Sequence, residues 1–351
     1  MEHKSLKDIS WLVTEEEYRE DSALSYSTLA TYERGGFSSI EHLKDKKESP
    51  ALTFGSAVDA IITGGTEEFE SRFIVADFPQ LSDKAVKIIR DLFKVYSTTC
   101  RTFDAISEIA VLSSINNYEY WSNCKSETKI KKLKEEGVAD YYDLMQLADG
   151  KTVINSETYN SVLASVTALR ESDSTKEFFC MDNPFEDKER LYQLKFKATL
   201  NDINYRCMSD LLVVDYKNKI ITPVDLKTSS HAEWDFFKSF VQWDYQIQAR
   251  LYWRIIRDNL DRDPYFKDFK LTDYRFIVVN KSTLTPLVWI FPMTTTVGTI
   301  VVGNSHPLKL RDPEEIGKEL SKYLEGNYSV PMGIKVNEEN NIIEWLKKEY
   351  D

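Results

Sequence analysis

At 351 residues, with 42% hydrophobic and 13% aromatic side chains, the chain can bury a full core and has the composition of an ordered globular protein. Its net charge of −12 argues against a protein that coats nucleic acid nonspecifically, but not against a DNA enzyme with a positive groove. The 4 cysteines form no C-x-x-C pair and the 4 histidines show no ligand spacing, so we expect no zinc. No signal peptide and no apolar run of ~18 residues is present, which predicts a cytoplasmic protein without a membrane span.

The first part of the chain predicts helices. Residues 14–35 indicate a helix capped at Ser25 or Ser27. The run FGSAVDAIITGG predicts an apolar helix that ends at residues 64–65. Residues 83–145 are helical in composition. Their lysine-rich run KSETKIKKLKEEG is either a solvated helix face, the interpretation we favour, or a contact for a phosphate backbone. A turn, a short strand and a long amphipathic helix follow, up to about residue 172.

From about Glu189 the hydrophobic period becomes that of strands, which predicts three strands in meander order. Two helices follow, the second from about Asp244 to Asp258, and then a second hairpin and a polar helical end. We predict an α/β (α+β) fold with one compact domain overall. Its parts are a helical N-terminal part (1–180), a core (181–300) and a C-terminal helical extension (301–351).

Three charged residues converge in the strand region. Asp225 and Lys227 are two apart on one strand, so their side chains point to the same side, and Leu226 points into a core. Asp210 stands at the start of the preceding strand, and a turn at Asp215–Lys219 brings that strand alongside. Two carboxylates and an ammonium in one small volume suit divalent-metal binding and water activation. A solvated cross-strand salt bridge is the alternative.

The order of these pieces resembles a known family. A helix with FGSAVDA, the Asp210 strand, the D-L-K-T strand at Asp225 and a helix with Q-A-R-L-Y at Gln248 follow one another. This order is similar to that of RecB/RecE-type exonucleases of the PD-(D/E)XK nuclease superfamily, particularly the phage-encoded, exodeoxyribonuclease VIII-like enzymes. The segment LSYSTLATYERG looks like the Ser-x-Ser-x-Leu helix of that family. The resemblance implies a restriction-endonuclease-like core, with a central mixed sheet flanked by helices.

The resemblance implies a metal-dependent exonuclease that hydrolyses linear DNA in phage-type recombination or DNA processing. One or two Mg²⁺ or Mn²⁺ ions would be the cofactor, and Lys227 would activate the attacking water. The resemblance further implies metal ligands and residues that border the DNA. The metal ligands are Asp210, Asp225 and the carbonyl of Leu226. Gln248 and Tyr252 would border the active site, position Lys227 for catalysis and touch the DNA, although Tyr252 is alternatively an ordinary packing residue of its helix. Ser25 and Ser27 would also lie beside the DNA. From their location alone, Glu189 is a further acidic candidate, and Lys197 and Arg206 are candidate phosphate contacts.

Two departures from the family pattern matter. Relatives usually carry G-x-x-x-H on the early helix, whereas this chain has Gly55-Ser-Ala-Val-Asp59. Asp59 is either a substitute hard-oxygen metal ligand or an ordinary helix-surface carboxylate. Some relatives bind an iron–sulfur cluster through cysteines on both sides of the core. This chain has no cysteine after Cys207, so no such cluster is expected.

The resemblance also implies partners. Relatives often form homo-oligomeric rings that thread DNA and act beside a single-strand annealing protein, in the bacterial host cytoplasm if the chain is phage-encoded. Two alternatives to the exonuclease stay open. One is a structure-specific or single-strand endonuclease of the same fold, and the other is a catalytically inactive DNA-binding or interaction protein.

Overall fold

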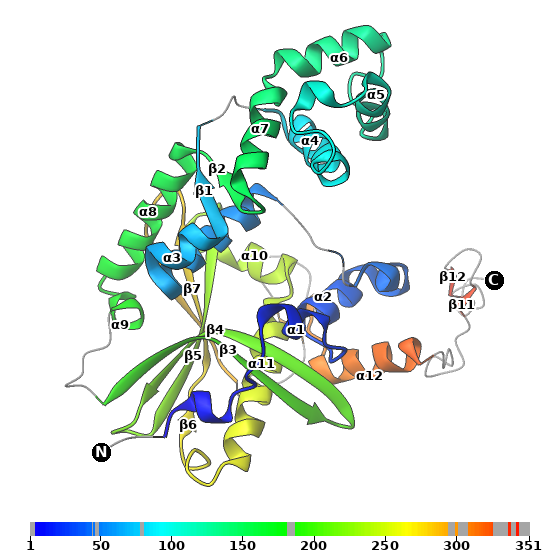
Figure 1. Ribbon diagram of the computed structural model, residues 1–351. Helices are drawn as coiled ribbons and strands as arrows, with labels where there is room; N and C mark the ends of the chain where they lie inside the picture. The colour runs from blue at the N-terminus through cyan, green and yellow to red at the C-terminus, as the bar shows by residue number, and fades with distance from the viewer. Residues whose placement is uncertain are drawn as a thin grey trace. The chain divides into compact units, whose positions relative to one another are not determined.

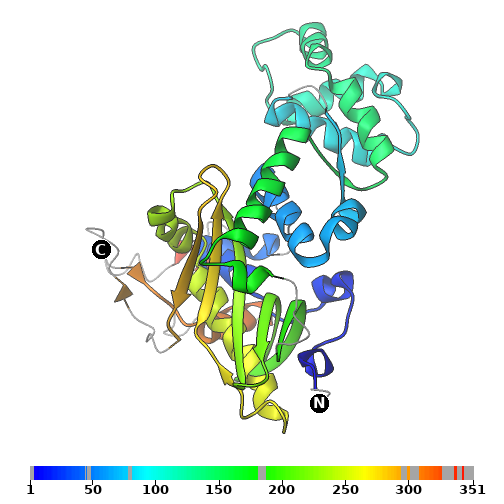
Figure 2. The ribbon, with the colours of Figure 1, turned by 90° about the vertical axis from the view of Figure 1, so that its left-hand side faces the viewer.

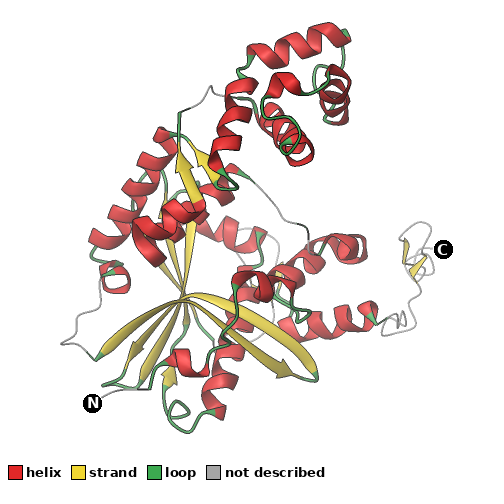
Figure 3. Cartoon of the chain, in the orientation of Figure 1, coloured by secondary structure: helices red, strands yellow, loops and turns green. Residues whose placement is uncertain are grey.

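The computed structural model describes residues 4–43, 45, 49–77, 81–180, 187–293, 299–300, 308–325, 336–337 and 342–343. The chain divides into two compact units (Figures 1 and 3). The first unit combines Met1–Glu48 with Ala168–Asp351, and the second is Ser49–Thr167. No helix in these described ranges is both long enough and apolar enough to cross a bilayer.

A mixed sheet forms the centre of the first unit, which confirms the predicted fold class. Its path is β3-β4-β5-β7-β8, and β6 pairs with β5. The predicted three-strand meander is confirmed, because β3, β4 and β5 are successive antiparallel neighbours. β7 runs parallel to β5 and forms a hairpin with β8. The strands are β3 (Lys188–Leu200), β4 (Ile203–Asp215), β5 (Ile220–Ser229), β6 (Lys270–Leu271), β7 (Tyr274–Asn280) and β8 (Pro286–Phe291).

The parallel step from β5 to β7 passes through two helices, as such a connection requires. They are α10 (Phe236–Gln242) and α11 (Tyr245–Arg262). α11 packs on β3 and β4 (Figures 1 and 2), and its buried side chains join those of the sheet in one core. α12 (Pro313–Leu324) contacts both α11 and α2 (Tyr26–Gly35). The sheet and α11 therefore hold any residue that lies between them in a fixed place.

The prediction of one helix over residues 14–35 is wrong, because the structure has two helices there. α1 (Glu15–Glu20) begins at a capping box in which Thr14 and Glu17 bond each other's backbone N–H groups. α2 begins at Ser25, one of the two predicted caps. Between them the chain is extended, and Leu24 forms a parallel bridge with Tyr205 of β4. This pairing with the sheet interrupts the helix, and it depends on a residue far away in the sequence.

Asp210 was predicted at the start of a strand, but it lies in the middle of one. β4 is 13 residues long because the chain turns tightly at Asn201 and Asp202, whose φ angles are 48° and 65°. Two consecutive positive φ angles are typical of a two-residue hairpin turn. The predicted turn at Asp215–Lys219 is confirmed, since β4 ends and β5 begins there and Asp215 accepts a hydrogen bond from the N–H of Asn218.

The second unit is mainly helical, with a two-stranded parallel sheet of β1 and β2. Its first helix was predicted to end at residues 64–65. The structure instead shows a kink at Gly65, with φ 70°, after which the helix continues to Arg72. The elements are α3 (Pro50–Arg72), β1 (Phe73–Val75), α4 (Asp83–Tyr96), α5 (Glu108–Asn117), α6 (Ser126–Glu135), α7 (Val138–Ala148), β2 (Thr152–Ile154) and α8 (Ser156–Glu171), whose last residues count with the first unit.

The remaining elements are short. They include α9 (Lys176–Phe179) and the 3-10 helices Leu6–Ile9, Gly36–His42, Phe103–Ala105 and Glu233–Asp235. The short strands β9 (Thr299–Ile300), β10 (Leu308–Lys309), β11 (Val336–Asn337) and β12 (Ile342–Ile343) complete the set. Within the predicted C-terminal helical extension, α12 is a helix, and most of the rest lies outside the described residues.

Candidate functional site

The candidate site centres on a buried carboxylate of β5. Asp225 is 1% exposed. The ammonium nitrogen of Lys227 lies 2.7 Å from Asp225 Oδ2, and Gln248 of α11 donates a hydrogen bond to Oδ1 over 2.5 Å. Asp225 and Lys227 therefore share one side of the strand, as predicted. Leu226 between them is half-buried, as Lys227 is, so the expectation that it points into a core stays a prediction.

Asp210 reaches the same place from β4. Its Oδ2 accepts a hydrogen bond of 2.9 Å from the backbone N–H of Leu226, the residue after Asp225. The paired run of β4 with β5 extends from Asp215 opposite Ile220 to Leu211 opposite Val224. Asp210 comes directly after that run, so its side chain takes a β5 backbone donor at the point where the ladder ends. The two carboxylates are thereby brought together, as the sequence predicted.

Strand β3, which pairs with β4 on its other side, is distorted opposite Asp210. The register of β3 with β4 pairs Tyr192 with Leu211 and then Leu194 with Ser209. Gln193, between them, has a φ of 53°. This left-handed conformation is uncommon for a residue other than glycine, and such strain in a strand is often found next to functional sites. Nothing in the hydrophobic pattern of the strand signals it.

Lys227 lies beside an aromatic pair. Its ammonium lies 4.8 Å from the centroid of Tyr245 of α11, and the ring of Tyr26 of α2 lies 6.4 Å from that of Tyr245. Burial by itself would lower the pKa of Lys227. The carboxylates of Asp225 and Asp210 outweigh that effect and, with the two tyrosines, raise the pKa above its usual value. Lys227 is therefore a cation in this arrangement.

Gln248 and Tyr252 lie on the side of α11 that faces the sheet. Gln248 is 4% exposed and binds Asp225, as described above. Tyr252 is 8% exposed, and its ring lies edge-on to Tyr274 of β7 with 6.5 Å between centroids. Burial raises the pKa of Tyr252 well above its usual value, so the phenol is neutral. Gln248 thus contacts the charged centre directly, whereas Tyr252 makes a packing contact with the ring of Tyr274.

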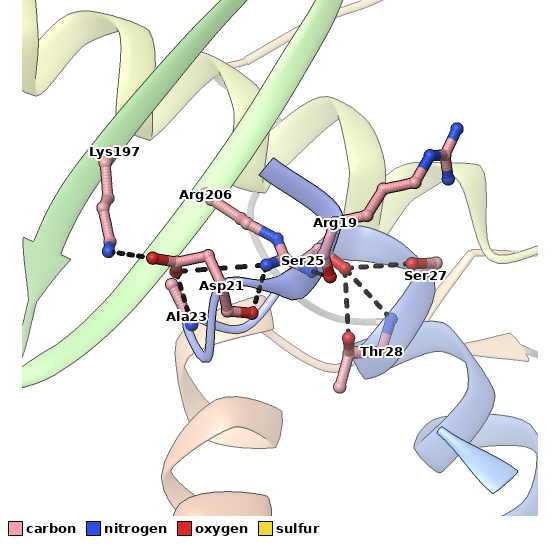
Figure 4. Close-up of polar contacts among 8 residues, drawn as sticks. All are labelled: Arg19, Asp21, Ala23, Ser25, Ser27, Thr28, Lys197 and Arg206. Carbon is pink, nitrogen blue, oxygen red and sulfur yellow. Dashed lines mark hydrogen bonds and ion pairs between the residues drawn. The ribbon is translucent and has the colours of Figure 1, made fainter. Parts of the chain in front are cut away.

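Ser25 and Ser27 lie at the start of α2, and their environments differ. Ser25 is 5% exposed, accepts from the N–H of Thr28 as the helix cap, and lies 2.9 Å from Ser27 through their hydroxyl oxygens (Figure 4). Ser27 is exposed. Tyr26 between them is the residue that approaches Lys227, a relationship that the Ser-x-Ser pattern did not reveal. The one sequence feature that could have pointed to Tyr26 is its position directly after a helix cap.

Lys197 and Arg206, the candidate phosphate contacts, are occupied elsewhere. Lys197 Nζ lies 2.6 Å from Oδ2 of Asp21, and Arg206 donates to the carbonyl oxygen of Asp21 (Figure 4). Arg206 is 7% exposed. Both residues therefore fasten the segment between α1 and α2 to the sheet. Glu189 is also engaged, with the hydroxyls of Tyr216 and Ser5, at the far end of β3.

Asp59 belongs to the second unit. It lies on α3, where its carboxylate accepts a hydrogen bond of 3.4 Å from the hydroxyl of Thr63 and lies 3.9 Å from Arg72. These contacts are those of a half-buried helix carboxylate. Its role as a metal ligand stays a prediction.

The chemistry of the donor set fits a hard divalent cation. Asp210 and Asp225 supply carboxylate oxygens from neighbouring strands, and such oxygens are what Mg²⁺ and Mn²⁺ prefer. Over the described part of the chain, the buried Oε1 of Gln248 and Oδ2 of Asp225 receive no hydrogen bond, although Lys227 is the ionic partner of the latter. Among the described residues of the chain, no three or more His, Cys, Asp or Glu side chains are grouped so that they could hold a metal ion by themselves. A cation bound here would need backbone and water oxygens as well.

The sequence and the fold were compared with those of known proteins. No family model and no curated protein matches the sequence. The chain is similar to the crystal structure of a candidate exonuclease from Eubacterium rectale, with a TM-score of 0.41 and 13% sequence identity. That match covers 90% of this chain and 88% of the other.

Proposed function

We propose that this chain is a divalent-metal-dependent deoxyribonuclease that hydrolyses phosphodiester bonds from the ends of linear DNA. The observation that carries the proposal is the buried carboxylate of Asp225, held between Lys227 and Gln248 with Asp210 beside it. A buried charge is costly unless it is paired or binds metal. A core apolar residue at position 225 would avoid this cost, so the arrangement supports a chemical role for the pair.

Asp210 and Asp225 are the proposed metal ligands, with the carbonyl of Leu226. Bound Mg²⁺ or Mn²⁺ would supply Lewis-acid activation of water and of the phosphate. Gln248 holds the plane of the Asp225 carboxylate through its amide, and the N–H of Leu226 holds Asp210. Both carboxylates are thus oriented before any ligand arrives, which is the arrangement that catalysis favours.

Lys227 is the proposed group beside the attacking water. Because its pKa is raised while Asp225 is its partner, its ammonium donates hydrogen bonds and offsets the charge of the phosphate. If Asp225 gives up that partnership to a cation, the largest influence that raises the pKa is weakened, and the lysine approaches the range of a general base.

A cleavage assay tests the proposal. The protein is incubated with linear duplex, single-stranded and covalently closed circular DNA, with Mn²⁺ or with EDTA. We expect loss of linear DNA with Mn²⁺ alone and an intact circle. Cleavage of the circle would support the endonuclease alternative, and no cleavage of any substrate would overturn the proposal.

Asp210→Asn is the matched variant for this assay. The asparagine keeps an oxygen that can accept from the N–H of Leu226 but lacks the charge that a cation requires. We expect an unchanged melting temperature and a cleavage rate at background. A variant that is folded and fully active would remove Asp210 from the proposed site.

A further inference from the structure

The junction between α10 and α11 presents an exposed indole. α10 ends at Gln242, and Trp243 follows with 41% of its surface exposed. Asp244, which precedes α11, has a φ of 54° and a ψ of 41°. This left-handed conformation is uncommon for a residue with a side chain, and such strain persists only where the surroundings enforce it.

Two side chains of α2 fix the backbone of the junction. The hydroxyl of Tyr26 donates to the carbonyl oxygen of Trp243 over 2.5 Å, and Arg34 donates to the same oxygen over 3.1 Å. Arg34 also pairs with the carboxylate of Asp244 at 3.1 Å. These contacts use the backbone of Trp243 and the side chain of Asp244. None of them requires the indole of Trp243.

The indole itself has one neighbour of note. The guanidinium of Arg34 lies 5.5 Å from the ring centroid, within the range of a cation–π contact. Such an arginine holds the ring in place, while the exposed fraction of the side chain leaves surface for another planar group. The ring of Tyr26, which donates to Trp243, lies 6.4 Å from the ring of Tyr245, and Lys227 lies over that second ring. The backbone of Trp243 is thus linked to the candidate site through two tyrosines.

We propose that Trp243, backed by Arg34, is a stacking platform for a nucleobase of a single-stranded segment beside the candidate site. This inference rests on the proposed function, and it adds the class of substrate. An aromatic ring stacks on any base, so the platform would be tolerant of sequence. In a duplex the bases already stack on each other, so the platform favours single-stranded DNA or a frayed end.

A binding measurement in EDTA tests the platform without hydrolysis. Labelled single-stranded and hairpin DNA are titrated with the full chain, and binding is followed by fluorescence anisotropy. We expect Trp243→Ala to bind the single strand roughly tenfold more weakly and Trp243→Phe to retain most of the affinity. The salt dependence should stay the same, because no phosphate contact is removed. An equal melting temperature will show that the junction keeps its fold.

Trp234→Ala is the matched control. Trp234 is 76% exposed and lies in the 3-10 helix that precedes α10, so it is an exposed indole near the same helix. Its substitution should leave the affinity for single-stranded DNA unchanged. Equal losses in the two variants would indicate nonspecific contact with exposed indoles and would overturn the assignment of Trp243.

The two proposals fail in different ways. If Mn²⁺-dependent cleavage is observed but Trp243→Ala binds as the wild type does, or if the wild type binds no single-stranded DNA, the platform is wrong. If binding depends on Trp243 but no substrate is ever cleaved, the platform stands as a binding site and the nuclease proposal is wrong.

Discussion

The ammonium of Lys227 pairs with the carboxylate of Asp225 at 2.7 Å, and the two side chains are 19% and 1% exposed. The folded-state pKa of Lys227 lies above the usual 10.5. The stability that this pair contributes is therefore fully present below pH 10.5 and is lost as the pH rises through the folded-state value. At any ordinary assay pH the pair is intact, so Lys227 has a structural part as well as the proposed catalytic one.

Lys227→Ala should abolish cleavage and also destabilise the protein. It leaves the buried carboxylate of Asp225 without its cation, which costs roughly 3 kcal/mol of the free energy of unfolding. Denaturant unfolding measures this cost, and the Mn²⁺ assay measures the rate. The double variant Asp225→Asn with Lys227→Met removes both charges, and it should recover much of the stability while staying inactive. Wild-type cleavage by folded Lys227→Ala would contradict the assignment.

Asp225→Asn should make Lys227 chemically more reactive. Burial lowers the pKa of this lysine, and the charge of Asp225 is the largest influence that raises it. Without that charge the pKa falls, so more of the amine is neutral at mildly alkaline pH. Acylation of Lys227, followed by peptide mass spectrometry, should therefore be faster in the variant. Lys238, an exposed lysine paired with Asp235, is the internal control and should react equally in both proteins. Slower acylation of Lys227 in the variant would show that the pair does not set its protonation.

Local sequence patterns predicted the strands, their order and the shared side of Asp225 and Lys227, because the alternation of side chains along a strand depends only on successive residues. They did not predict what approaches those residues from elsewhere. Tyr245 could have been found from its position three residues before Gln248 on one helix, which places both on a similar face. Tyr26 lies about two hundred positions earlier in the sequence, and no local pattern specifies that contact.

The partners of the two basic residues were also not predictable from local patterns. Lys197 and Arg206 were candidates because they lie on the core strands, but their partner Asp21 is on the loop between α1 and α2. Such pairing depends on the three-dimensional fold. The position of Asp210 in the middle of β4 was not predicted, because the tight turn at Asn201–Asp202 that precedes the strand is not marked by a glycine.

Gln193→Gly should stabilise the protein and reduce its activity. At a φ of 53° a side chain strains the backbone, and glycine relieves that strain by about 1 kcal/mol relative to alanine. Gln193→Ala is the control, since it removes the same side chain and keeps the strain. The glycine variant should unfold at higher denaturant concentration than the alanine variant. If the distortion beside Asp210 orients its carboxylate, the cleavage rate should fall as the stability rises. Equal stability of the two variants would mean that the backbone relaxes at no cost.

Asp21→Asn should destabilise the protein at neutral pH, and by less in acid. Burial alone would raise the pKa of Asp21, but the hydrogen bonds from Lys197 and from the N–H of Ala23, with the charge of Arg206, lower it below the usual 3.8. A lowered pKa contributes stability that is present above pH 3.8 and is lost as the pH falls through the folded-state value.

The expected loss on Asp21→Asn is about 2 kcal/mol at pH 7, the order of a hydrogen bond to a charged group. Unfolding by denaturant over a series of pH values will show whether the two proteins converge below pH 3.8. Asp268→Asn, at an exposed position, is the control and should change the stability by less than roughly 0.5 kcal/mol at every pH. A loss that is the same at acid and neutral pH would mean that Asp21 acts through its shape and not through its charge, and that Lys197 and Arg206 are held by other contacts.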